Sequence, residues 1–149
     1  MFEFTATPPL SLYIHIPWCV RKCPYCDFNS HEVRDGIPES AYLAALTGDL
    51  EQELPRVWGR TVDSVFIGGG TPSLFSVASI ERLLAGLRDS CEVAPDAEIT
   101  LEANPGTADA RNFSAYRAAG INRLSMGVQS LSAGQLERLG RIHGPNEAR

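Results

Sequence analysis

Extended apolar segments alternate four times with segments of helical periodicity along this 149-residue chain. Such alternation is typical of right-handed βαβ units, which build a mainly parallel sheet. The expected strands are residues 11–17, 63–67, 98–103 and 123–128. We therefore expect an α/β fold made of parallel (βα) repeats.

The intervals between these strands carry helix signals. Apolar residues recur at spacings of three and four over about 39–54. A second helix is indicated by Ile80, Leu83, Leu84 and Leu87. A third is expected from about 108 to 119, with Gly120 as its C-terminal cap. Ser132-x-x-Gln135 resembles a capping box that opens a fourth helix, which makes about four βα units in all.

Each expected strand leads into a segment of unusual composition. Ligands of parallel α/β folds bind at the carboxyl ends of the strands. The segments are a cysteine-rich loop after the first strand, residues 68–72 after the second, residues 102–105 at the end of the third and Gln129 after the fourth. Because parallel strands all end at one edge of the sheet, we expect these segments to form a single site.

Three cysteines follow the first strand with the spacing Cys19-x3-Cys23-x2-Cys26. Thiolates are soft ligands suited to iron–sulfur clusters. A four-iron cluster held by three protein thiolates leaves one iron open to a substrate or cofactor. The alternatives are buried free thiols or a zinc site, for which His15 or Cys91 would have to supply a fourth ligand.

The composition is ordinary for a globular domain, with 44% apolar and 21% charged residues and a net charge of −5. The basic residues are spread along the chain, which argues against nucleic acid as a partner. No apolar run reaches the roughly 18 residues that a membrane span needs. Crowding of three of the four cysteines does not resemble a secreted disulfide framework, so we expect a cytoplasmic protein without a transmembrane segment.

Residues 13–26, YIHIPWCVRKCPYC, resemble the cluster-binding motif of radical S-adenosylmethionine (SAM) enzymes, and in particular that of the oxygen-independent coproporphyrinogen III oxidase family. Further motifs of that family are matched in order by GGGTP at 68–72, EANP at 102–105, SMGVQS at 125–130 and RLGRIH at 138–143. The resemblance covers about 10–149. It implies that residues 1–149 are the N-terminal part of a radical SAM partial (βα)6 barrel, without the rest of the barrel and the C-terminal domain.

The resemblance also implies cofactors and the residues that hold them. Cys19, Cys23 and Cys26 would ligate a [4Fe–4S] cluster, whose remaining iron binds S-adenosyl-L-methionine. The residues implied around SAM are Tyr13, Tyr25, Gly69, Gly70, Thr71, Glu102, Gln129 and Arg141. The alternatives are structural: aromatic packing for the tyrosines, a tight turn for the glycine loop, a surface charge for the glutamate, and bracing of the barrel for the last two.

Two departures from the oxidase pattern indicate a subfamily. The oxidase has a fourth cysteine two places after the third, where this sequence has Phe28, and a longer extension than the 18 residues before Cys19. Both favour the radical-SAM-type heme chaperones, and imply heme, heme-accepting respiratory proteins and an electron donor as partners. The alternatives are a coproporphyrinogen III oxidase of porphyrin biosynthesis, and a non-catalytic fragment that retains the motif.

Overall fold

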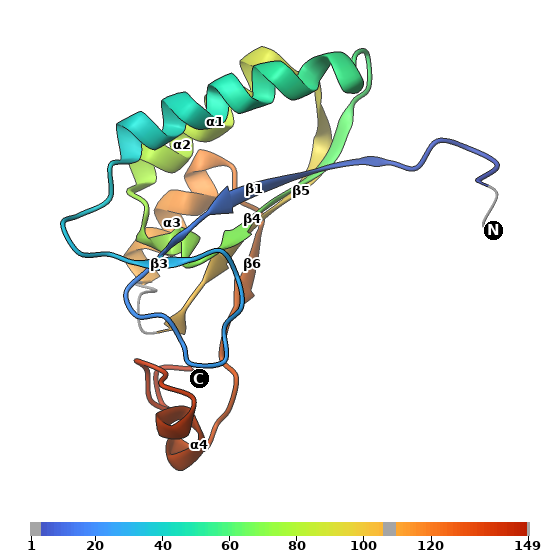
Figure 1. The fold of residues 1–149 in the computed structure, drawn as a ribbon. Helices are drawn as coiled ribbons and strands as arrows, with labels where there is room; N and C mark the ends of the chain where they lie inside the picture. Colours follow the sequence, from blue (N-terminus) through green and yellow to red (C-terminus); the bar gives the residue numbers. More distant parts are fainter. Residues whose placement is uncertain (1–3, 106–109, 149) are drawn as a thin grey trace.

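The structure is a computed structural model that describes residues 4–105 and 110–148 (Figure 1). Its strands are β1 (Leu10–Ile16), β2 (Trp18–Cys19), β3 (His31–Glu32), β4 (Val62–Gly69), β5 (Val93–Ala103) and β6 (Arg123–Met126). Its helices are α1 (Glu39–Glu53), α2 (Val77–Ser90), α3 (Ala110–Ala119) and α4 (Ala133–Arg138), with short 3-10 turns η1 (Leu54–Arg56) and η2 (Pro72–Leu74). The alternation expected from the sequence is confirmed.

Four strands form one parallel sheet in the order β1-β4-β5-β6. A parallel strand must return to the same end of the sheet, so a helix separates each pair of neighbouring strands. All four strands therefore end at the same edge. The remaining strands, β2 and β3, form a small parallel pair at that edge.

Helices α1, α2 and α3 cover one face of the sheet (Figure 1). Alternate residues of β1, Ile14 and Ile16, point into the core on this face, as expected for a strand period of two. Ile80 and Leu84 of α2 are buried against them at 1% exposure or less. Burial of this apolar layer supplies the main favourable free energy of folding.

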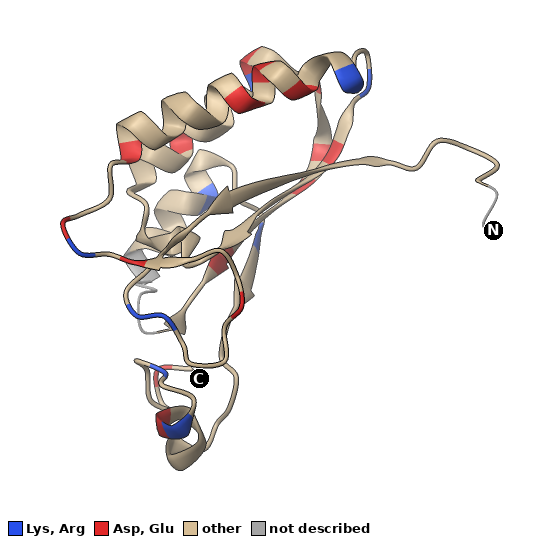
Figure 2. Ribbon diagram, in the orientation of Figure 1, with Lys and Arg blue, Asp and Glu red and all other residues tan. Residues whose placement is uncertain are grey.

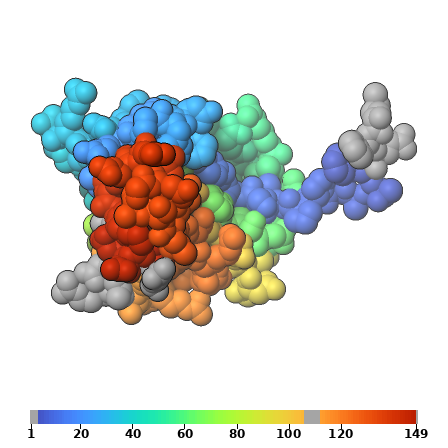
Figure 3. All heavy atoms as spheres, turned by 90° about the horizontal axis from the view of Figure 1, so that it is seen from below, coloured from blue at the N-terminus to red at the C-terminus, as the bar shows by residue number. Residues whose placement is uncertain are grey.

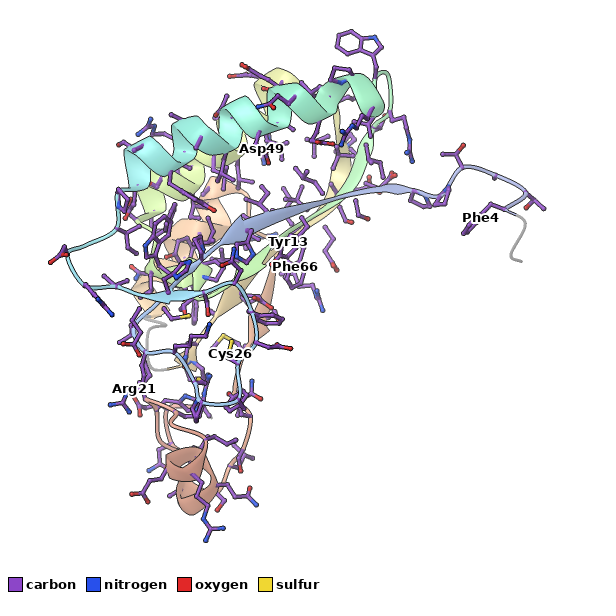
Figure 4. All side chains as sticks on the ribbon, in the orientation of Figure 1. Phe4, Tyr13, Arg21, Cys26, Asp49 and Phe66 are labelled. Carbon is purple, nitrogen blue, oxygen red and sulfur yellow. The ribbon has the colours of Figure 1, made fainter. Side chains whose placement is uncertain are left out.

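The opposite face of the sheet carries polar and aromatic side chains. Tyr13 is 56% exposed, and its ring stacks on that of Phe66 with centroids 6.2 Å apart. Figure 4 shows these two side chains next to each other on the sheet. The Ser64 hydroxyl donates to that of Ser11 on the neighbouring strand over 2.8 Å. A parallel sheet that carries helices on one face only is the arrangement of an incomplete (βα) barrel wall, in which the second face would line the barrel interior.

Several strand boundaries differ from the sequence expectation, and β4 for example ends at Gly69 instead of residue 67. Strand β5 begins at Val93 instead of residue 98, because Val93 pairs with Val62 across a register shift. Strand β6 ends at Met126 instead of residue 128. The expected start of the third helix, at about 108, lies outside the described residues, and its described part begins at Ala110.

The helix caps also give a mixed result. Gly120 ends α3 at φ +116°, and the N–H of Ile121 donates to the Tyr116 carbonyl, which confirms the predicted C-terminal cap. The predicted capping box at α4 is wrong. Ser132 is the N-cap, but its side chain makes no cap hydrogen bond. The reciprocal bond from Gln135 is also missing, because Gln135 Oε1 pairs with the Ser130 hydroxyl and the Ser132 N–H donates to that hydroxyl oxygen instead.

Charged residues are distributed over several elements (Figure 2), with acidic side chains along α1 and basic ones near the lower edge of the sheet. Within residues 4–105 and 110–148, no helix combines the length and the apolar character that crossing a membrane requires.

Candidate functional site

A cavity of about 310 Å³ lies where the strands of the sheet end. Its wall is formed by residues 19–30, here called the cysteine loop, by the ends of β4, β5 and β6, and by the segment after α4. Figure 3 views the molecule from this end, with the cysteine loop in blue beside the C-terminal segment in red. Ten residues selected from the sequence line this cavity: Cys19, Cys23, Tyr25, Cys26, Gly69, Gly70, Thr71, Glu102, Gln129 and Arg141.

The cysteine loop is closed at its base by backbone pairing. Trp18 and Cys19 of β2 pair with the two residues of β3. Within the loop the N–H of Cys26 donates to the Cys23 carbonyl over 3.0 Å and closes a turn, and both cysteines line the cavity. Cys19 is buried, the other two are half-buried, and all three are free thiols. Figure 4 shows Cys26 below the sheet, at the site edge.

This set of donors fits a [4Fe–4S] cluster. Cysteine thiolates are the ligands of such clusters, and each binds a different iron, so the sulfurs surround the cluster without converging on one point. Among the side chains that the structure describes, no group of three His, Cys, Asp or Glu residues has the geometry of a metal-ion site. The fit to a cluster rests on the chemistry of the three thiols, which line one cavity.

Lys22 braces the cysteine loop from inside. Its Nζ donates to the carbonyls of Phe28 over 3.1 Å and Ser30 over 3.3 Å. Its backbone N–H donates to the Glu32 carboxylate over 2.9 Å. The ammonium group thus ties the second half of the loop to the first. Motif reasoning did not find this role, because the spacing of the cysteines says nothing about which loop carbonyls lack partners.

The glycine loop packs directly against the chain that leads to the cysteines. The N–H groups of Gly70 and Thr71 donate to the carbonyls of Ile16 and Trp18 over 2.8 and 2.7 Å. A Cβ on Gly70 would lie 2.6 Å from the Trp18 carbonyl oxygen. Glycine is therefore required here by the chain's own packing, whether or not a ligand approaches the loop.

Glu102 joins the third strand of the sheet to this glycine loop. Its carboxylate accepts a hydrogen bond from the N–H of Gly69 over 3.1 Å. Gly69 has φ +116°, and a Cβ there would lie 2.7 Å from the His15 ring. The partly buried carboxylate at the cavity wall thus has a backbone donor, as a charged group away from water needs.

Tyr13 does not line the cavity. Its hydroxyl is 3.0 Å from Nδ1 of His15, whose Nε2 lies 2.7 Å from the Asn29 carbonyl oxygen. A carbonyl can only accept, so Nε2 donates to it, and in the tautomer with its proton on Nε2 the Nδ1 atom accepts from the Tyr13 hydroxyl. Burial, and after it the charge of Glu102, raises the pKa of Tyr13. Contact of Tyr13 with SAM stays a prediction.

Arg141 reaches the cysteine loop from the far end of the chain. Its Nη1 lies 3.5 Å from the Cys23 sulfur and 3.5 Å from the Tyr25 hydroxyl, and its Nη2 donates to the Gly127 carbonyl. Burial first, and then Cys23, raise the pKa of Tyr25, against the opposing influence of Arg141. The guanidinium therefore links the cysteine loop to the segment after β6.

Gln129 enters the cavity from a tight turn. It has φ +67°, and the N–H of Ser130 donates to the carbonyl of Val128 over 2.8 Å. This is a γ-turn centred on Gln129 with a positive central φ, a type that is rare and strained. The turn explains why β6 stops short of Val128.

Several cavity residues were not selected from the sequence. They are Arg21, Phe28, Ala103, Asn104, Ser125, Met126 and Gly127. Asn104 and Met126 lie within motifs that carried the resemblance, so position in those motifs was the available signal. Phe28 is 60% exposed at the cavity wall, at the position where the oxidase pattern has a cysteine.

Comparison with known sequences identifies the family. Residues 13–149 match the radical SAM superfamily. The chain is 57% identical over 142 residues to the heme chaperone HemW of Escherichia coli and 55% identical over 146 residues to that of Haemophilus influenzae. Each match covers 95% of this chain and 38% of the relative. A bovine mitochondrial protein, radical S-adenosyl methionine domain-containing protein 1, is 41% identical over 93% of this chain and 31% of its own.

Solved structures agree with this assignment. The coproporphyrinogen III oxidase HemN of Escherichia coli superposes with a TM-score of 0.85 at 36% identity, over 94% of this chain and 32% of that one. The archaeal Elp3 of Methanocaldococcus infernus, 14% identical with a TM-score of 0.60 over 95% of this chain and 34% of its own, shares the fold. The chain thus spans about 38% of the length of HemW relatives. The family match, the parallel (βα) sheet and the triad of cysteines agree: this chain belongs to the radical SAM superfamily.

Proposed function

We propose that this protein is a radical-SAM-type heme chaperone, which binds a [4Fe–4S] cluster, SAM and heme and transfers heme to respiratory proteins. The observation that carries the proposal is the 57% identity to HemW. It is supported by a cavity in which the three cysteines meet the other motif residues. Because the chain spans 38% of that relative, heme binding and transfer are proposed for a whole protein in which residues 1–149 form the N-terminal part of the radical SAM core.

The proposed cofactor site uses the residues of the cavity. The thiolates of Cys19, Cys23 and Cys26 would hold the cluster. When bound, the cluster and SAM supply one-electron chemistry that no side chain offers. Glu102 and residues 69–71 offer a carboxylate and backbone groups to the SAM amino group. Their mutual hydrogen bond already fixes these groups at one place in the wall.

The carboxylate of SAM has a suitable partner in Arg141. In the described structure the Nε of this residue is buried and has no hydrogen-bond partner. A buried donor without a partner is unfavourable, and pairing with a carboxylate would satisfy it with a charge-assisted hydrogen bond. Gln129 and the ring of Tyr25 line the same cavity, so we assign them to SAM as well.

The proposal extends to compartment and partners. Four free cysteines suit the reducing cytoplasm, where we place the protein. An electron donor would reduce the cluster, and heme-accepting respiratory proteins would take the cargo.

Anaerobic reconstitution of the full-length protein with iron and sulfide tests the cofactor site. We expect about four iron and four sulfide per chain, because a cubane cluster contains that number of each. We also expect SAM to change the electron paramagnetic resonance spectrum of the reduced cluster. Stoichiometric zinc in place of iron, or a cluster spectrum that SAM leaves unchanged, would overturn the proposal.

Coproporphyrinogen III oxidation is the second candidate function, because HemN superposes with a TM-score of 0.85. Phe28 in place of the oxidase's additional cysteine argues against it. Incubation of the reconstituted protein with SAM, a reductant and coproporphyrinogen III separates the two. Formation of protoporphyrinogen would support the oxidase, whereas stable heme binding and heme transfer to an apo-protein without turnover would support the chaperone.

A further inference from the structure

His143 is a buried histidine that the proposed cofactor site does not use. This residue is only 4% exposed and lies five residues after the end of α4. Gly140, with φ +67°, turns the chain back toward the sheet, and the N–H of Arg141 donates to the Leu136 carbonyl over 2.9 Å. This reversal brings His143 under the carboxyl ends of the strands.

Both ring nitrogens of His143 contact segments that end neighbouring strands. Nε2 lies 3.1 Å from the carbonyl oxygen of Val128, which follows β6. Nδ1 lies 3.2 Å from the Oδ1 of Asn104, which follows β5. The carbonyl can only accept, so Nε2 is the donor of the first bond, and in that tautomer Nδ1 accepts. The second contact is therefore a hydrogen bond in the amide orientation that turns the NH2 group of Asn104 toward the ring. One side chain therefore joins the chain after α4 to the ends of two strands.

The carbonyl that His143 binds belongs to the strained turn at Gln129. The oxygen of Val128 accepts from the Ser130 N–H and from His143 Nε2. A residue other than glycine at positive φ persists only where its surroundings hold it. The bond from His143 fixes the peptide on the N-terminal side of Gln129, and so the direction in which its side chain enters the cavity.

The same anchor holds Arg141, two residues before His143. Arg141 contributes Nη1 to the Cys23 sulfur and a buried Nε to the cavity wall. The anchor at His143 acts together with the reversal at Gly140 and the contacts of the guanidinium in holding this segment against the sheet.

We infer that His143 is a positioning residue that orients Gln129 and Arg141 toward bound SAM. This inference rests on the proposed cofactor site, because it assigns a purpose to the geometry of that site. It requires no proton transfer by the imidazole.

The variants His143→Ala and His143→Gln test the inference in the full-length, anaerobically reconstituted protein. The first removes both hydrogen bonds, whereas the glutamine amide can still donate to the Val128 carbonyl. We expect His143→Ala to keep its iron content but to bind SAM about tenfold more weakly, because two buried hydrogen bonds are lost. We expect His143→Gln to recover most of the affinity. His31→Ala, at an exposed histidine, is the matched control.

Hydrogen–deuterium exchange gives a readout that does not depend on SAM. The Ser130 amide should exchange at least about fivefold faster in His143→Ala than in the wild type, because its acceptor is no longer held. Exchange as slow as in the wild type, or SAM affinity unchanged in a cluster-loaded His143→Ala variant, would overturn the inference. Equal loss of SAM affinity in both variants would also overturn it. Absence of SAM binding by the wild type would instead defeat the proposed function, and the exchange rates would still decide the role of His143.

Discussion

The backbone N–H of Gly69 donates a hydrogen bond to the carboxylate of Glu102 over 3.1 Å, and so joins the end of β4 to the end of β5. Replacement Glu102→Gln keeps an acceptor for this bond but removes the charge. We expect its urea unfolding midpoint to match the wild type, while SAM affinity falls about tenfold because a charge-assisted hydrogen bond is lost.

Glu102→Ala completes this test. It leaves the Gly69 N–H without its partner, so the free energy of unfolding should fall by about 1–3 kcal/mol in addition to the loss of SAM affinity. Normal SAM binding by both variants would show that the carboxylate only braces the glycine loop.

The cysteines of the loop should differ sharply from Cys91 in cluster binding. Cys19→Ser, Cys23→Ser and Cys26→Ser each remove a thiolate, so iron and sulfide content after reconstitution should drop well below half of the wild-type value. Cys91 lies just after α2, where its thiol donates to the Leu87 carbonyl and burial raises its pKa. Cys91→Ser should keep full cluster content. Equal loss in all four variants would indicate general misfolding.

Gly70→Ala should destabilise the glycine loop. The added Cβ would lie 2.6 Å from the Trp18 carbonyl oxygen and 2.9 Å from backbone carbons of Pro17 and Trp18, and backbone atoms cannot give way easily. We expect a loss of about 2 kcal/mol or more in the free energy of unfolding, measured by urea denaturation.

Gly86→Ala is the matched control for this glycine. A Cβ there meets no atom within 4 Å, and Gly86 lies inside α2. Alanine is the better helix former by about 1 kcal/mol, so this variant should be more stable than the wild type. Destabilisation of both variants to the same extent would contradict the packing argument.

The carboxylate of Glu39 should stabilise the fold only at pH values at which it is ionised. Burial alone would raise the pKa of Glu39, but hydrogen bonds from Ser76 and Ser79 outweigh it, so the pKa lies below the usual 4.5. The Ser76 hydroxyl donates to the carboxylate over 2.6 Å and links α1 to the start of α2. A carboxylate whose folded pKa is depressed stabilises the fold above its unfolded pKa and loses that effect as pH falls through the folded value.

The variant Glu39→Gln tests this dependence. It should be less stable than the wild type at pH 7 by less than about 1 kcal/mol, since the group is only partly buried and solvent screens its charge. The difference should shrink as pH falls below 4.5. Urea denaturation of both proteins across pH 3–7 measures it, and a difference that does not change with pH would contradict the assignment.

Lys22 should affect cluster retention without being a ligand. Lys22→Met removes the donor that holds the carbonyls of Phe28 and Ser30. We expect reconstitution to succeed, but iron loss to a chelator to be several times faster than in the wild type, because the loop opens more often. Arg34→Met, at an exposed residue after β3, should behave as the wild type. Equal rates in all three proteins would exclude the bracing role.

The helices and strands whose sequence signals are local were predicted correctly. Strand and helix periodicity located β1, α1 and α2, and Gly120 marked the end of α3, because each signal lies within a few residues of the feature that it determines. The capping box at Ser132 failed for a related reason. Ser130 competes for the side chain of Gln135, and a four-residue pattern does not include that neighbour.

The sequence motifs predicted which segments form the site, but not the hydrogen bonds that hold those segments in place. The gathering of the cysteines, the glycine loop, Glu102 and Gln129 follows from parallel topology, because strand ends share one edge. The bonds of Lys22 and His143 could not be foreseen. They depend on which carbonyls are left without partners after the strands have paired, and that is decided by the whole fold.

Arg141 and Cys23 are in contact but lie 118 residues apart in the sequence. The ribosome therefore makes Cys23 well before Arg141. A ribosome that adds about 5–20 residues per second needs roughly 6–24 s to make that interval. For that time the nascent Cys23 thiol is present without the guanidinium that later lies 3.5 Å from it. During this interval iron and sulfide can reach the cysteine loop without obstruction by Arg141. Oxidants can reach it as well, so the thiols are most exposed to damage during this stretch of translation.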